Sequence, residues 1–140
     1  MNEITDQLNR HWTNIYYHLH YTHQEKITHQ AIRIMQHIEK NQHATVGFIA
    51  KKLSVSHNTA SEHIKRLIQK GYIEKIRKQM DERKVFLSLT QEGKDVLHYN
   101  TALDQDKLAA ILDRLSESKQ KRILEAFATL AEEAKKCSSF

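Results

Sequence analysis

The sequence of 140 residues has one cysteine, three glycines and no proline, and each scarcity excludes a class of protein. A single thiol, Cys137, excludes an intrachain disulfide framework and a zinc site built from several thiolates. Three scattered glycines cannot form a glycine-rich phosphate loop, so P-loop and dinucleotide-binding proteins are excluded. The lack of proline, with abundant Gln, Glu, Lys, Leu and Ala, indicates a mostly helical chain. No cofactor is predicted.

Long apolar runs are also absent. The sequence contains no 18 consecutive apolar residues, so we expect no membrane span and no membrane partner. The first ten residues carry acidic side chains and no apolar run, which is unlike a signal peptide. These features predict a cytoplasmic protein. The length fits a single domain over 1–140, and no linker or repeat divides it.

The positive charge is concentrated in one quarter of the chain. Residues 51–84 contain ten basic and four acidic residues, a net charge of +6, whereas the remainder holds twelve basic and thirteen acidic residues. A solvated charged face is the simplest interpretation of such a cluster. A basic block in an otherwise neutral chain, however, favours a polyanionic partner.

Apolar spacing predicts helices on both sides of a basic hairpin. An apolar residue recurs every three or four positions from Ile4 to Leu19, which indicates a helix with more than one apolar face. Four further helices are predicted: from Thr28 through Ile38, from Thr45 through Leu53, from after Ser56 to about Lys70 and, as one long element, from Thr90 to about residue 112. A last one starts near Ser116. Alternation predicts a strand over 85–89 and a weaker one near 73–76, joined by a polar hairpin tip at 78–84.

A short helix, a three-residue turn, a second helix and a basic hairpin together describe a winged helix-turn-helix. Ala50 is small where the two helices cross, and Val55 fills the turn. The second helix places apolar residues inward and hydrogen-bonding side chains outward, on a helix narrow enough for the major groove of DNA. The outward residues are Asn58, Glu62, Lys65, Arg66 and Gln69. An amphipathic helix in a plain bundle is the alternative, and the adjoining basic hairpin argues against it.

Residues 45–93 resemble the core of the MarR family of transcriptional regulators. The motifs that carry the resemblance are LSVS at 53–56, LIQKGYIE at 67–74, the D-x-R of Asp81 and Arg83, and LTQEG at 89–93. The flanking helices match the family's layout along the chain. The resemblance implies a mainly α fold with a small β-hairpin wing, in which a winged helix-turn-helix (28–90) is flanked by dimerisation helices (1–27 and 91–140). It also implies a homodimer on pseudo-palindromic duplex DNA, usually a repressor released by a small molecule or an oxidant.

The outward helix face and the resemblance together predict the residues that contact DNA. Arg83 is the predicted minor-groove contact of the wing, with Asp81 as its orienting partner. Glu62 stands where the family often has a basic or neutral residue, and Gln79-Met80 where proline is common. The predicted DNA-binding residues are Ser56, His57, Asn58, Thr59, Ser61, Glu62, Lys65, Arg66, Lys78, Asp81, Arg83 and Lys84.

An aromatic and histidine cluster near the N-terminus is a second candidate site. Trp12, Tyr16 and His20 are predicted to line an effector pocket, and aromatic packing in a dimer interface is the alternative. The ten histidines raise the possibility of a metal-responsive regulator, but no two are spaced i,i+4 and no metal ligand is predicted. Cys137, near the end of the chain, is predicted to be inert.

Catalytic motifs are absent. The sequence has no H-E-x-x-H, G-x-S-x-G or phosphate loop, so it predicts a protein that is not an enzyme. Two functions from different classes remain. The first is a DNA-binding regulator tuned by a ligand; the second is a winged-helix module whose basic face binds an acidic protein surface.

Overall fold

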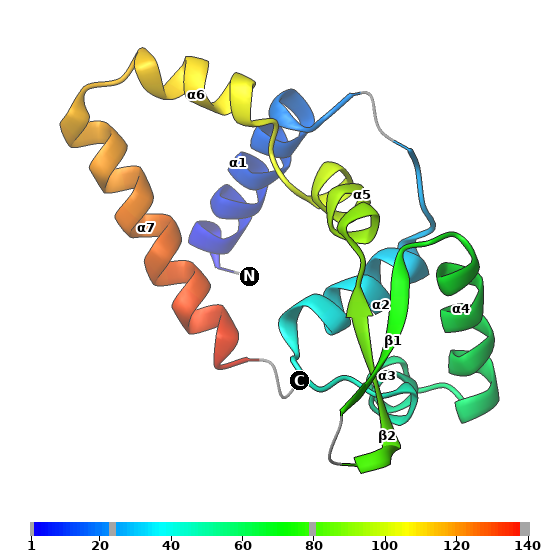
Figure 1. Ribbon diagram of the computed structural model, residues 1–140. Coiled ribbons are helices and arrows are strands. Elements are labelled where there is room, and N and C mark those ends of the chain that lie inside the picture. The colour runs from blue at the N-terminus through cyan, green and yellow to red at the C-terminus, as the bar shows by residue number, and fades with distance from the viewer. Residues whose placement is uncertain (1, 23–24, 79–80, 138–140) are drawn as a thin grey trace. The chain divides into compact units, whose positions relative to one another are not determined.

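The protein is mainly helical, with a two-stranded antiparallel wing, as predicted (Figure 1). The computed structural model describes the backbone of residues 2–22, 25–78 and 81–137, and their side chains except those of 78 and 81–83. Within these residues the elements are α1 (Glu3–Leu19), α2 (His29–Lys40), α3 (Val46–Leu53), α4 (His57–Gln69), β1 (Ile73–Lys78), β2 (Asp81–Leu89), α5 (Gln91–Thr101), α6 (Gln105–Asp113) and α7 (Glu117–Lys135).

Each of these helices begins after a residue whose side chain accepts a hydrogen bond from a backbone N–H of the first turn. Such caps satisfy donors that have no partner within the helix, and replacing one by alanine typically costs about 1 kcal/mol. The helix starts predicted at Thr28, Thr45, Thr90 and Ser116 are therefore confirmed. The seven capping residues are Asn2, Thr28, Thr45, Ser56, Thr90, Asp104 and Ser116.

One predicted helix was wrong: the element expected from Thr90 to about residue 112 is two helices. α5 ends at Thr101, and Ala102 is extended with φ −92° and ψ 164°. Asp104 then starts α6, because its carboxylate accepts hydrogen bonds from the N–H groups of Asp106 and Lys107 at 3.0 and 3.3 Å. The apolar residues keep a helical spacing across the break, and this spacing concealed it.

The wing packs one face of its two strands on the helices. Ile73 pairs with Leu89 and Lys75 with Leu87, and Ile73, Leu87 and Leu89 are buried. The backbone N–H of Leu87 also donates to the carbonyl of Ala44 at 2.8 Å, which fastens β2 to the connection between α2 and α3. The predicted hairpin tip at 78–84 is shorter in the structure, since β1 extends to Lys78 and β2 begins at Asp81, while residues 79 and 80 lie outside the described part.

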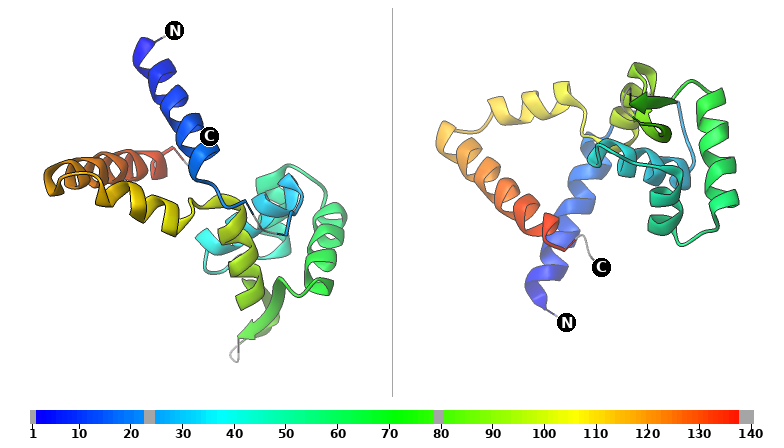
Figure 2. Two further views of the ribbon diagram at one scale, coloured as in Figure 1. Left: turned by 90° about the horizontal axis from the view of Figure 1, so that it is seen from above. Right: turned by 60° about the horizontal axis from the view of Figure 1, so that its bottom comes forward.

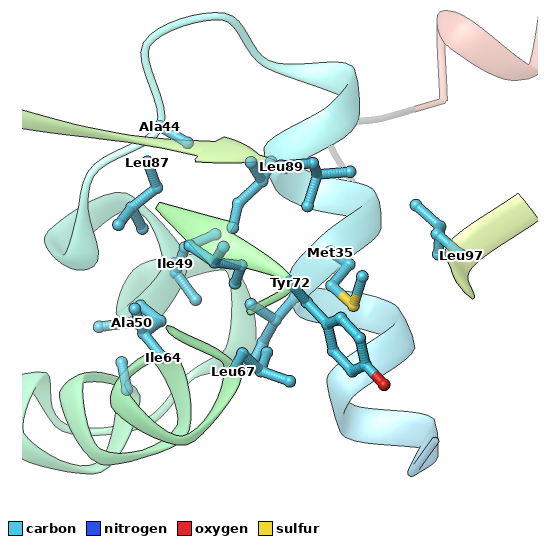
Figure 3. Close-up of a cluster of buried hydrophobic side chains, with 14 residues drawn as sticks. Met35, Ala44, Ile49, Ala50, Ile64, Leu67, Tyr72, Leu87, Leu89 and Leu97 are labelled. Atoms are coloured by element: carbon cyan, nitrogen blue, oxygen red, sulfur yellow. The ribbon is translucent and has the colours of Figure 1, made fainter. Parts of the chain in front are cut away.

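The hydrophobic core lies between α2, α3, α4, the wing and α5 (Figure 3). Ala50, Ala60, Ile64 and Leu67 are buried there, as the helix-turn-helix pattern predicted, and Val55 packs against them. Small Ala50 and Ala60 allow α3 and α4 to cross closely. The other buried members of the core are Ile34, Met35, Ile38, Ala44, Ile49, Tyr72, Ile73, Leu87, Leu89 and Leu97.

Two segments of backbone cross closely where α4 ends and α5 begins. Gly71 ends α4 with φ +83°, a left-handed conformation that favours glycine. The Thr90 hydroxyl donates to the Gly71 carbonyl at 2.5 Å, and the Thr90 N–H donates to the Tyr72 carbonyl at 3.0 Å. A Cβ at Gly93 would lie 2.1 Å from that same Tyr72 oxygen, so only glycine fits there without a shift of the backbone. Gly71 of the LIQKGYIE motif and Gly93 of the LTQEG motif thus allow the two backbone segments to cross at Tyr72.

The chain forms two compact units, residues 1–102 and 103–140. In the first, α1 extends away from the group formed by α2, α3, α4 and the wing in both views of Figure 2, and Leu19 is its one buried residue. In the second, α6 and α7 contain no buried residue and line a cavity of about 510 Å³ with Leu108, Leu112 and Phe127 among its walls. Among the residues that the structure describes, no helix is long and apolar enough to span a membrane.

Tyr72 generates a prediction about alkaline pH. A hydrogen bond to the Glu25 side chain, burial and the charges of Glu25 and Glu92 raise the pKa of Tyr72 to about 12 from 10.0. Because the folded-state pKa is raised, this contribution to the unfolding free energy is complete below pH 10 and is lost as the pH rises towards 12. We therefore expect the parent to lose more stability than Tyr72→Phe across this interval, measured by urea unfolding. Other tyrosines and the lysines titrate in both proteins, so equal losses would contradict the assignment.

Candidate nucleic-acid interface

The turn between α3 and α4 fixes where the second helix of the motif begins. Ser54 ends α3 with φ 54° and ψ 46°, and the Val55 N–H donates to the Ala50 carbonyl at 3.0 Å. Ser56 then caps α4: its hydroxyl oxygen accepts from the Thr59 N–H at 3.1 Å and lies 2.9 Å from the Thr59 hydroxyl oxygen. No acidic residue lies in the first turn of α4, so the partial positive charge of this helix end is not neutralised locally.

The outward face of α4 carries the polar residues that the sequence predicted. Ala60, Ile64 and Leu67 are buried on the other face, which fixes the helix about its own axis. Ser61 is half-buried, and the remaining predicted residues of this segment are exposed. The exposed residues are Ser56, His57, Asn58, Thr59, Glu62, Lys65 and Arg66.

The wing residues are described less completely. Lys84 is exposed on β2, as expected for a residue that contacts DNA. The predicted contacts at Lys78, Asp81 and Arg83 have backbone positions in the hairpin, but their side chains lie outside the described residues.

Among the described side chains of residues 51–84, no basic group forms an ion pair. The three ion pairs among the described side chains join Lys40 to Glu39, Lys135 to Glu132 and Lys136 to Glu133, all outside residues 51–84. The Lys52 ammonium instead lies 5.7 Å from the centre of the Phe48 ring. Burial, followed by the nearby charges of Arg33 and Lys52, lowers the pKa of His37. The net charge of +6 over residues 51–84 is what favours a polyanionic partner here.

Two cavities flank α4. A cavity of about 540 Å³ between α4 and β1 has apolar walls, with Ser61, Lys65, Glu74 and Lys75 at its polar positions. A smaller cavity of about 130 Å³ lies between α4 and the start of α2, where Thr28, His63, Arg66 and Lys70 join Ile27, Ala31, Ile34 and Leu67. The larger cavity has the size and the mostly apolar walls of a small-molecule site, for which about 300–1,000 Å³ is usual, whereas the smaller one falls below that range.

Sequence reasoning missed Lys75 and the set Thr28, His63 and Lys70 at these cavities. Thr28 stands 35 positions before His63 in the chain. No spacing rule connects residues that only the packing of separate elements brings together.

The predicted effector residues lie along α1. The Tyr16 and His20 rings stack with centres 5.5 Å apart, and the Tyr16 hydroxyl donates to the Asn100 carbonyl of α5 at 3.1 Å. Trp12, one turn earlier, is 51% exposed. Their assignment as a pocket remains a prediction. Cys137 is exposed, and the part of the chain that the structure describes contains no group of three or more His, Cys, Asp or Glu residues able to hold a metal ion.

Comparison with known proteins identifies a matching family and a sequence relative. The family model described as transcriptional regulator SarA/Rot matches residues 18–100. An uncharacterized HTH-type transcriptional regulator, YwhA of Bacillus subtilis (strain 168), is 25% identical over 99 residues, which are 71% of each chain.

Solved structures give the same fold. Streptococcus pneumoniae FabT in complex with DNA is 24% identical, with a TM-score of 0.58, over 95% of this chain and 96% of that one. S. aureus MepR bound to ethidium bromide is 17% identical, with a TM-score of 0.60, over 94% of both chains. The predicted winged helix-turn-helix and its resemblance to MarR-type regulators are therefore confirmed.

Proposed function

The chain belongs to the SarA/Rot family of transcriptional regulators, and from this we propose that it is a sequence-specific repressor that binds a pseudo-palindromic operator as a homodimer and is released by a small molecule. It is a DNA-binding regulator and not an enzyme. The observation that carries the proposal is the outward face of α4, a capped helix that is held by its apolar side and exposes its hydrogen-bonding side chains beside a basic wing.

In this proposal α4 enters the major groove. Side chains near its start, Asn58 and Glu62 among them, meet base edges, whereas Lys65 and Arg66 meet phosphates. The wing lies over the neighbouring minor groove, where Arg83 inserts and Asp81 orients its guanidinium. The remaining predicted contacts are Ser56, His57, Thr59, Ser61, Lys78 and Lys84.

Apolar surface on α1 and in the second unit supports a homodimer. Ile4, Leu8 and Trp12 lie on one stripe of α1 and are 64%, 53% and 51% exposed. In α7, Leu124 and Leu130 are 70% and 60% exposed. Large apolar side chains exposed at helical spacing on one element are typical of interaction sites. We propose that a second copy covers it, with residues 1–27 and 91–140 as dimerisation helices.

A relative and a cavity support release by a small molecule. MepR binds ethidium, and the present chain has a cavity of about 540 Å³ beside α4 in addition to the predicted site at Trp12, Tyr16 and His20. A ligand that binds only the form unable to bind the operator lowers operator affinity by mass action.

Salt dependence tests the central proposal. If each dimer neutralises roughly 6–10 phosphates, log K for an operator fragment should fall with log salt with a slope of about −5 to −9. Band-shift titrations with the DNA upstream of its own gene, at several salt concentrations, measure this slope. A slope near zero would contradict DNA binding and favour a winged-helix module that binds protein.

Glu62→Gln tests base reading by α4. A carboxylate repels phosphate but can accept a hydrogen bond from cytosine N4, so its loss should strengthen non-specific binding and blur the preference at one base pair per half-site. Selection from a randomised operator library measures both effects. Glu74→Gln, an exposed residue of β1, is the matched charge control and should leave base preference unchanged. If Glu62→Gln selects the same sequences as the parent, Glu62 reads no base.

Leu8→Glu tests the dimer. A charge in the centre of the apolar stripe of α1 should convert a dimer into a monomer at micromolar concentration, measured by sedimentation. Thr13→Glu adds the same charge on the opposite side of α1 and should leave the dimer intact. A parent that sediments as a folded monomer would overturn the proposal.

A further inference from the structure

The connection between α1 and α2 is tied to two distant parts of the first unit through Glu25. Residues 20–28 join α1 to the winged helix-turn-helix, and Glu25 is exposed near their middle. Its backbone carbonyl is hydrogen-bonded to α5, and its side chain is hydrogen-bonded to a core residue at the end of α4.

On one side, Glu25 is held by α5 and, through it, by α1. The Asn100 side-chain amide donates to the Glu25 carbonyl at 2.9 Å and to the Val96 carbonyl of its own helix at 2.8 Å. The Asn100 backbone carbonyl accepts from the Tyr16 hydroxyl at 3.1 Å. A second contact lies close by, where the Tyr21 hydroxyl oxygen is 3.2 Å from Nε2 of His98. Asn100 of α5 thus contacts both α1, through Tyr16, and Glu25.

On the other side, the Glu25 side chain is hydrogen-bonded to a residue that follows α4, the helix proposed to enter the major groove. The Tyr72 hydroxyl donates to the Glu25 carboxylate, and Figure 3 shows this hydroxyl at the edge of the buried cluster. The Tyr72 ring is buried, and its N–H donates to the Leu67 carbonyl in the last turn of α4 at 3.0 Å. Tyr72 therefore joins the Glu25 side chain to the backbone at the end of α4.

We propose that Glu25 is a positioning residue for DNA binding, which couples α1 and α5 to the C-terminal end of α4 through the path Tyr16–Asn100–Glu25–Tyr72. The inference rests on the proposed operator binding and deepens it. A change at α1, whether from a partner subunit or a ligand, alters the position of the C-terminal end of α4 through this path. The side chains that contact DNA are themselves unchanged. The simpler reading is that these hydrogen bonds only anchor the connection.

Single-atom deletions separate the two readings. Tyr16→Phe and Tyr72→Phe should each weaken operator binding between about twofold and tenfold, the range for loss of one hydrogen bond. Because both act through one path, the double variant should bind no worse than the weaker-binding single variant, whereas independent sites would multiply their effects. Tyr17→Phe is the matched control, since Tyr17 neighbours Tyr16 on α1 and is 72% exposed. Operator affinities are compared at one salt concentration.

Glu25 itself supplies a rescue experiment. Glu25→Ala removes the acceptor of the Tyr72 hydroxyl and should weaken operator binding as much as Tyr72→Phe does. Glu25→Gln keeps an acceptor oxygen and should restore most of the affinity. Equal losses in the alanine and glutamine variants, multiplicative effects of Tyr16→Phe and Tyr72→Phe, or equal affinities for Tyr16→Phe and Tyr17→Phe would each overturn the coupling.

A measurement on the free protein tests the coupling separately from the proposed DNA binding. Hydrogen exchange of the free protein reports the amides of Lys70 and Tyr72, which donate to Arg66 and Leu67. Tyr16→Phe should accelerate exchange of these two amides, and Tyr17→Phe should not. If the parent binds no operator but this difference appears, the proposed function fails and the coupling stands; if both variants exchange like the parent, the coupling fails.

Discussion

The winged helix-turn-helix depends on the backbone crossing at Tyr72. The carbonyl groups of Gly71 and Tyr72 accept hydrogen bonds from the hydroxyl and the N–H of Thr90, and Gly93 lacks the side chain that would separate the two segments. This crossing fixes the relative positions of three parts of the chain: the end of α4, the first residue pair of the wing (Ile73 and Leu89) and the start of α5. A side chain at Gly93 would force apart three elements at once, because the interior is close-packed and cannot yield at one of them alone.

The side chains that this core does not bury form the surface of the first unit. α4 buries its alanine, isoleucine and leucine side chains, so its amides, hydroxyls and charged groups face the solvent. Positive side chains gather there without ion-pair partners among the described residues of 51–84. A rigid helix with an uncompensated positive surface suits a polyanion whose phosphates supply the missing charge, and the bases can then be read at short range.

The exposed apolar residues of α1, α6 and α7 complement this arrangement. They lie on helices that contribute little or nothing to the core of the chain described here: Leu19 is the single buried residue of α1, and α6 and α7 bury none. In the proposed homodimer a second copy covers these residues. Such a dimer would also set the distance between the two α4 helices, which one chain alone does not fix.

The sequence by itself determined the local features: the caps at Thr28, Thr45, Thr90 and Ser116, the three-residue turn, the inward face of α4 and the alternating strand at 85–89. Each depends on residues a few positions apart, so spacing and residue type suffice. The break at Asp104 was missed although its signal is local, because the apolar spacing continues across it. Only the tertiary structure decided what joins distant positions: the cavities beside α4, the close approach of Gly93 to Tyr72, and the path from Tyr16 through Asn100 and Glu25 to Tyr72. These contacts span up to 84 positions of the chain, and their partners are selected by packing, to which no period in the sequence corresponds.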